Sequence, residues 1–206
     1  MRPHKNHHTP RFVVEDKSLE QSLTSKSPVI ARPLFLPEQT IQYFGQVNAS
    51  NNEHVIDEIK TRMHISPDRE LYLIVTSNGG STGAGMSFYD TMQYILRPNL
   101  LTIGSGDVDT SSMLVLLSGG KRFVTKNTTV FLHSACRIFD GSRKYTASEM
   151  ECMAKEDRVK DQQYAYTLSD RGKNITTHEV LDMMEKNTVL TPRELFSLGL
   201  VDGILE

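Results

Sequence analysis

The chain has 206 residues, which is a suitable length for one α/β domain with a sizeable core. Its 23 basic and 25 acidic residues give a formal net charge of -2, which gives no case for a nucleic-acid or anionic-membrane partner. No apolar stretch approaches the roughly 20 residues of a membrane span, and the two cysteines form no CxxC pair, so we expect a protein of a reducing cytoplasm.

The first part of the chain differs from the rest in composition. Residues 1–30 are polar and irregular, and we expect a flexible N-terminal segment ahead of one domain at 31–206. His4, His7 and His8 lie in this segment, but no second ligand cluster supports a metal site there, so a mobile tail is favoured. The sequence predicts neither a metal nor a cofactor.

The next elements read as strand, helix, strand. Strand-like pieces occupy 34–36 and 41–44, and Ser50 with Glu53 forms a capping box that opens a helix. The apolar run 71–75 predicts a strand that is buried on both faces. Because such a crossover is normally right-handed, we expect the strands to be parallel. The buried stripe of the helix is predicted to be Val55, Ile56, Ile59 and Met63.

A glycine pair follows the buried strand. Gly79 and Gly80 allow a tight turn and leave their backbone N–H groups uncovered. Such N–H groups can stabilise an anion, either a phosphate or a developing oxyanion. A helical pattern follows, with Phe88, Met92 and Ile95 at i, i+4 and i+7.

The sequence then repeats this strand, turn and helix. We expect a strand at 100–103, a turn at 104–110 and a short apolar helix at 111–117. His133 ends a further apolar run at 130–132. Two strand-to-helix corners and a histidine are parts that an acyl-transfer site needs.

A long polar helix dominates the C-terminal third. It begins at the capping box of Thr146 and Glu149 and is predicted to run to about residue 169. Its centre, 155–163, is mostly charged or polar, so we expect the helix to project from the body. The last two helices also begin at capping boxes, Thr176 with Glu179 and Thr191 with Glu194.

Separated blocks of the sequence resemble the proteolytic subunit of the Clp protease, and they occur in the order of that family. The resemblance covers about residues 32–205 and includes the long helix, which is similar to the family's inter-ring handle. It implies an α/β fold of the ClpP/crotonase-like type, a repeated strand–strand–helix spiral with a projecting handle helix. Residues 31–206 would then form a ClpP-like peptidase domain. The matching blocks are 78–86, 89–93, 106–119, His133 and 199–202.

The resemblance also implies a catalytic site, position by position. Thr110 takes the place of the family's serine nucleophile, and His133 takes the place of its general base. The backbone N–H groups of Gly80 and Ser111 take the place of the oxyanion donors. Asn187 lies where the family has the aspartate that orients the histidine.

Two of these positions depart from the family pattern. A threonine hydroxyl can attack a carbonyl, but its methyl group stiffens χ1 and crowds the approach. Asn187 can accept a hydrogen bond from the histidine but has no charge to stabilise an imidazolium. In a serine protease, replacing the triad aspartate by asparagine costs about four orders of magnitude in rate. Cysteine peptidases use asparagine in this role, so the loss of activity is not automatic.

The register of the second corner leaves an alternative nucleophile. Aligning residues 116–117 with the family's helix places Ser111 in the serine position. Ser112 resembles the serine of the family's Ser-Met pair only after a larger shift, and we rank it third. Asp109 either adds a negative charge beside the nucleophile or caps the following helix.

Three functions remain open from the sequence. The first is a self-compartmentalised serine or threonine endopeptidase subunit that hydrolyses unfolded proteins. The second is a catalytically silenced ring subunit of the same architecture. The third is a crotonase-like acyl-CoA enzyme, which the long helix and the block 89–93 disfavour.

The resemblance implies partners as well. It implies a homo-oligomer of stacked heptameric rings, a tetradecamer, into which an AAA+ unfoldase feeds unfolded polypeptide in the cytoplasm. No nucleic acid or membrane is implied. The sequence leaves open whether an unfoldase partner or a second, standard ClpP-type subunit exists.

Overall fold

The computed structural model describes residues 35–139 and 141–205. The expected flexible segment 1–30 lies outside the described residues, as do its three histidines and Leu34. The boundary between that segment and the domain therefore stays a prediction.

The described strands form a five-stranded sheet and a two-stranded sheet. In the larger sheet the order is β1-β2-β3-β4-β7, and all neighbours are parallel. In the smaller sheet β5 pairs with β6 in antiparallel orientation. The α/β class and the parallel first unit are confirmed. The strands are β1 (Thr40–Phe44), β2 (Leu71–Ser77), β3 (Leu100–Val108), β4 (Lys121–Thr125), β5 (Val130–Leu132), β6 (Thr188–Leu190) and β7 (Gly203–Leu205).

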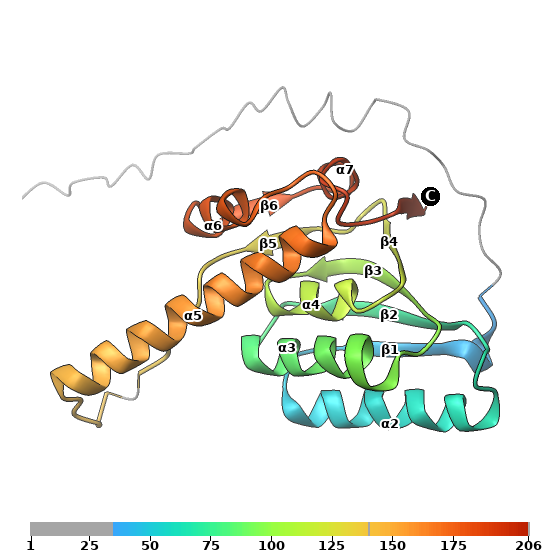
Figure 1. Cartoon of the computed structure of the whole chain (residues 1–206), viewed down its shortest axis with the longest axis horizontal. Coiled ribbons are helices and arrows are strands. Elements are labelled where there is room, and N and C mark those ends of the chain that lie inside the picture. The colour runs from blue at the N-terminus through green and yellow to red at the C-terminus, as the bar shows by residue number, and fades with distance from the viewer. Residues whose placement is uncertain (1–34, 140, 206) are drawn as a thin grey trace, which may run out of the picture.

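Three helices lie along the larger sheet, whereas α6 packs against α5 and the smaller sheet (Figure 1). Figure 1 shows α2, α3 and α4 lying next to one another along β1, β2 and β3, whereas the N-terminal half of α5 extends away from the body. The helices are η1 (Pro37–Gln39), α2 (Ala49–Ile65), α3 (Thr82–Asp90), η2 (Thr91–Leu96), α4 (Ser111–Leu117), α5 (Ala147–Arg171), α6 (Thr177–Glu185) and α7 (Pro192–Ser197). The projecting handle helix is therefore confirmed.

The main core surrounds α4, all of whose residues are buried. Val55 and Ile59 of α2 are buried in the same core, while Ile56 and Met63 pack at its margin, as the helical stripe predicted. The predicted capping boxes at the start of α5, α6 and α7 are all present. Among the described helices, none is long and apolar enough to cross a membrane.

The start of α2 was predicted wrongly. The helix begins at Ala49, and the N-cap is Asn48, whose Oδ1 accepts a hydrogen bond of 2.9 Å from the N–H of Asn51. Asparagine caps a helix at least as well as serine, so the helix is capped at Asn48, before the capping box predicted at Ser50 and Glu53. The predicted strand at 34–36 is also wrong where the structure describes it, because Phe35 and Leu36 lead into η1.

Two further predictions failed around the second unit. The segment 104–110 is not a turn throughout, because β3 continues to Val108, which pairs with Ser77 beyond a bulge in the register. Ile95 is 72% exposed and does not share the helical face of Phe88 and Met92 that the i, i+4, i+7 spacing indicated. The chain changes to π-helical geometry at η2, which rotates Ile95 away from the face of Phe88 and Met92.

Candidate active site

Thr110 joins β3 to α4 in a strained backbone conformation. Its φ is 41° and its ψ is -107°, and a positive φ is a genuine outlier for a β-branched residue. Such strain costs on the order of 1–3 kcal/mol and persists only where the surroundings enforce it. Here the N–H of Thr110 donates to the carbonyl of Phe131 at 2.9 Å, and its carbonyl accepts from the hydroxyl of Tyr164 at 2.8 Å. Strained strand-to-helix turns present the nucleophile in α/β-hydrolases.

The side chain of Thr110 lies at the edge of a cavity. The residue is 8% exposed, and its Oγ1 donates to the carbonyl of Phe131 at 3.2 Å. Thr110 is the N-cap residue of α4 by position, but its side chain makes no capping hydrogen bond to the helix. The cavity has a volume of about 230 Å³ and is lined by Gly80, Ser81, Thr82, Thr110, His133, Ala135, Cys136, Arg137, Asp157 and Lys160.

At the first strand-to-helix corner, between β2 and α3, the N–H group of Gly80 points away from Val47. Val47 donates its N–H to the carbonyl of Gly79 at 2.9 Å and accepts from the N–H of Ser81 at 2.8 Å. In a parallel bridge of this kind the central residue, Gly80, directs its own N–H away from the partner strand. A Cβ atom on Gly80 would overlap the carbonyl oxygen of Val47, so only glycine fits this close approach.

The second predicted oxyanion donor is the N–H of Ser111. Ser111 is the first residue of α4, and the first N–H groups of a helix have no partner within it. The next two N–H groups, of Ser112 and Met113, donate to Asp109 and Thr110. In the described part of the chain, neither Gly80 nor Ser111 donates its N–H to a protein acceptor.

The serine side chains beside Thr110 are not placed for attack. Ser111 is fully buried, and its Oγ has no hydrogen-bond partner among residues 35–139 and 141–205. The Oγ of Ser112 donates to the carbonyls of Ser77 at 3.0 Å and Asp109 at 2.8 Å. Neither serine lines the cavity, so the geometry favours Thr110 over both alternatives.

His133 follows β5 and also lines the cavity. Its Nδ1 lies 2.7 Å from the carbonyl oxygen of Ser134. A carbonyl only accepts, so Nδ1 bears a proton, and in the neutral imidazole Nε2 is the acceptor that a general base requires. Within the described ranges no hydrogen bond joins His133 to Thr110, and such bonds are often long before substrate binds.

Asn187 would lie opposite His133 in the register of the β5–β6 ladder, but no hydrogen bond joins the two described side chains. Leu132 pairs with Thr188 in the β5–β6 ladder, so the next pair in that register would be His133 and Asn187. Asn187 instead has a φ of 53° and an exposed side chain, and the Nδ1 of His133 is bonded to Ser134. The predicted hydrogen bond between Asn187 and His133 is therefore absent from the described residues, because the left-handed backbone turns Asn187 out of the ladder.

Of the two roles predicted for Asp109, the helix cap is wrong. Asp109 does not cap α4, because its Oδ1 accepts the N–H of Phe131 at 2.7 Å and so fastens β5 to the second corner. Burial raises the pKa of Asp109 above its usual value, and the hydrogen bond from Phe131 opposes this shift.

Two side chains of α5 hold the loop that follows His133, and the sequence did not indicate either of them. Asp161 accepts the N–H of Ala135 at 2.8 Å. Asp157 accepts two hydrogen bonds from Arg137, at 2.7 and 2.8 Å. Their spacing on one helical face was the only available signal, and a solvated polar face has the same pattern. The described residues contain no cluster of three His, Cys, Asp or Glu side chains that could hold a metal ion.

Comparison with known proteins gives a consistent result. The family model described as "Clp protease" matches residues 26–206. The ATP-dependent Clp protease proteolytic subunit 1 of Thermobifida fusca (strain YX) is 30% identical to the chain over 172 residues. This alignment covers 82% of the chain and 75% of that protein.

Proposed function

The chain belongs to the Clp protease family, and from this premise we propose that it is an active endopeptidase subunit that cleaves unfolded polypeptides. One observation carries the proposal. Thr110 is held in a strained strand-to-helix turn, and it shares a cavity of about 230 Å³ with His133 and Gly80. A hydroxyl, an imidazole and an uncovered backbone N–H are the groups that acyl transfer to a hydroxyl requires.

Thr110 is the nucleophile in the proposed reaction. Its Oγ1 attacks the carbonyl carbon of the scissile peptide, and the proton passes to Nε2 of His133. The C–N bond then breaks, the imidazolium gives the proton to the leaving amine, and an ester remains on Thr110. Water, deprotonated by the same imidazole, hydrolyses the ester and restores the hydroxyl.

The N–H groups of Gly80 and Ser111 stabilise the oxyanion of the tetrahedral intermediate. Both are backbone donors that use no other protein acceptor in the described residues. Removing a single oxyanion donor from a serine protease lowers kcat about 10²- to 10³-fold. The conformation of the two corners therefore matters as much as the identity of the nucleophile.

The carbonyl of Ser134 orients the histidine in this chain. It fixes the tautomer of His133 through the 2.7 Å contact with Nδ1, which is the role that the sequence assigned to Asn187. A neutral carbonyl stabilises the imidazolium less than a carboxylate does. We therefore expect slow turnover compared with a site that contains the aspartate.

We further propose the assembly that the resemblance to the Clp protease family implies. The Thermobifida fusca relative is a proteolytic subunit of an ATP-dependent protease. In the proposed assembly this chain forms stacked heptameric rings in the cytoplasm, alone or with a second ClpP-type subunit. An AAA+ unfoldase supplies the unfolded substrate.

A silenced subunit is the second candidate, and two observations favour it. The Oγ1 of Thr110 donates to the carbonyl of Phe131 rather than to His133. Asn187 is exposed and turned out of the β5–β6 ladder. In this alternative the chain shapes the chamber while another subunit cleaves.

Cleavage of a fluorogenic peptide and of unfolded casein tests the proposal. We expect Thr110→Ala to lower turnover by about 10³-fold or more, because it removes the attacking oxygen. Thr61→Ala is the matched control, since Thr61 lies on the exposed face of α2 and should leave turnover unchanged. Wild-type turnover in Thr110→Ala would refute the assignment. An inert wild type that gains activity on Thr110→Ser with Asn187→Asp would establish the silenced alternative.

A further inference from the structure

One face of α5 contacts the parts of the candidate site from several sides. Asp157, Asp161, Tyr164 and Arg171 are spaced by four, three and seven residues, so they lie on one side of the helix. The two aspartates hold the loop that follows His133. The other two residues hold opposite ends of α4, the helix that begins directly after Thr110.

Tyr164 holds the N-terminal end of α4. The residue is 1% exposed, and its hydroxyl donates to the carbonyl of Thr110 at 2.8 Å. Burial raises the pKa of Tyr164, so the hydroxyl remains a neutral donor throughout the physiological range. The same carbonyl also accepts the N–H of Met113 at 3.0 Å, which is the bond that starts the helix. Tyr164 therefore fixes the peptide group that connects the strained residue to Ser111.

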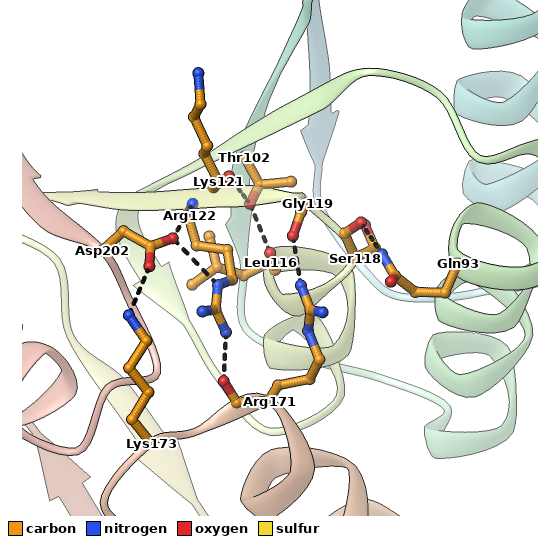
Figure 2. Close-up of polar contacts among 10 residues, drawn as sticks. All are labelled: Gln93, Thr102, Leu116, Ser118, Gly119, Lys121, Arg122, Arg171, Lys173 and Asp202. Atoms are coloured by element: carbon orange, nitrogen blue, oxygen red, sulfur yellow. Dashed lines mark hydrogen bonds and ion pairs between the residues drawn. The ribbon is translucent and has the colours of Figure 1, made fainter.

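The C-terminal end of α4 is held by side chains from three other elements. The last carbonyls of a helix have no partner within it, and a side chain must replace that partner when the helix is buried. Figure 2 shows three side-chain donors at this end, one to a carbonyl of α4 and two to the residues that directly follow the helix. Thr102 donates to Leu116 at 2.6 Å, Gln93 to Ser118 at 2.6 Å, and Arg171 to Gly119 at 2.7 Å.

Arg171 is itself fixed in place. Its carbonyl accepts a hydrogen bond of 2.8 Å from the guanidinium of Arg122, which is 5% exposed. Arg122 lies 3.5 Å from the carboxylate of Asp202, and Lys173 lies 3.5 Å from the same carboxylate (Figure 2). Hydrogen bonds at both ends of α4 therefore oppose a shift of the helix along its axis that would relieve the strain at Thr110.

We propose that Tyr164 is a positioning residue that keeps Thr110 in its strained conformation, and this inference rests on the proposed function. When the tyrosine hydroxyl is removed, the Thr110 carbonyl loses one of its two partners and the backbone can rotate toward an unstrained φ. The Ser111 N–H moves with that peptide group. The attacking oxygen and one oxyanion donor then lose their alignment together.

Tyr164→Phe in the full-length protein tests the proposal, because it removes only the hydroxyl. We expect kcat for a fluorogenic peptide to fall about tenfold, equivalent to about 1.4 kcal/mol, with KM unchanged. A second readout does not require activity. The ¹³C shifts of Thr110 report its backbone angles, and we expect them to move toward ordinary helical values in the variant.

Two matched variants separate positioning from stability. Tyr166→Phe alters an exposed tyrosine of the same helix, 64% exposed, and should change neither readout. Tyr43→Phe removes a buried hydroxyl that donates to Asn52 at 2.7 Å, so it should lower stability without moving kcat or the Thr110 shifts.

The outcomes are distinguishable from those of the proposed function. An equal loss of kcat in Tyr43→Phe and Tyr164→Phe would overturn the positioning role, as would unchanged Thr110 shifts in Tyr164→Phe. If the wild type is inert, the proposed function fails, but the shifts of Thr110 still decide whether Tyr164 holds the strained conformation.

Discussion

Gly80→Ala perturbs the first corner where the structure allows no side chain. The added Cβ would lie against the carbonyl oxygen of Val47 and only 2.9 Å from its nitrogen. Both neighbours are backbone atoms, so the corner must move as a unit away from Val47. That movement breaks the bonds from Val47 to Gly79 and from Ser81 to Val47, of 2.9 and 2.8 Å.

The size of the effect follows from these contacts. Two backbone hydrogen bonds contribute about 0.5–1.5 kcal/mol each, which gives about 1–3 kcal/mol. The φ of 154° at Gly80 adds roughly 1 kcal/mol of strain for a residue with a Cβ. We therefore expect the free energy of unfolding to fall by about 2–4 kcal/mol. Peptide cleavage should fall about 10²-fold or more, since one oxyanion donor is displaced.

Urea unfolding followed by circular dichroism measures the first effect, and fluorogenic peptide cleavage measures the second. Gly83→Ala is the matched control. Its Cβ would meet only the Oγ of Ser81 at 3.8 Å, and alanine favours the helix by up to about 1 kcal/mol. Equal stability of the Gly80 and Gly83 variants would refute the close approach at Val47. A stable Gly80→Ala protein with full activity would refute the oxyanion role.

Two further predictions concern stability. Folding raises the pKa of Asp109, so the folded state becomes less stable as pH rises through about 4 and above, and this cost is absent at lower pH. Asp109→Asn keeps an acceptor for the N–H of Phe131 without the charge. The free energy of unfolding of this variant, relative to wild type, should therefore increase from about pH 3 to about pH 7. A difference that is constant with pH would contradict the buried charge. Asn48→Ala should lower the free energy of unfolding by about 1 kcal/mol in urea titrations, whereas Ser50→Ala should lower it little, and the reverse order would contradict Asn48 as the cap.

Local signals in the sequence predicted most of the fold. The apolar run at β2, the glycine pair after it and the three later capping boxes each involve neighbours within a few residues. The capping boxes depend on hydrogen bonds within one segment, and the strand and its turn are marked by the residue types of a short stretch. One error arose where a distant partner decided the outcome, because the strand pairing of Val108 with Ser77 extends β3 into the expected turn. The error at the start of α2 was local, because Asn48 caps the helix in place of Ser50.

The candidate site was predicted in part for the same reason. The sequence order identified the two corners and His133, which the fold places around one cavity. It could not predict that Ser134 occupies the Nδ1 of His133, or that a left-handed φ turns Asn187 away. Tyr164 gave no signal either, because a tyrosine in a polar helix is distinguished only by the carbonyl it meets 54 residues away.

Covalent labelling at the candidate site tests the central claim most directly. A fluorophosphonate forms a P–O bond with an activated hydroxyl and expels fluoride, and peptide mapping by mass spectrometry locates the adduct. We predict a single adduct on Thr110 that is lost in Thr110→Ala and after modification of His133. An adduct on Ser111 or Ser112, or an unlabelled protein, would contradict Thr110 as the nucleophile.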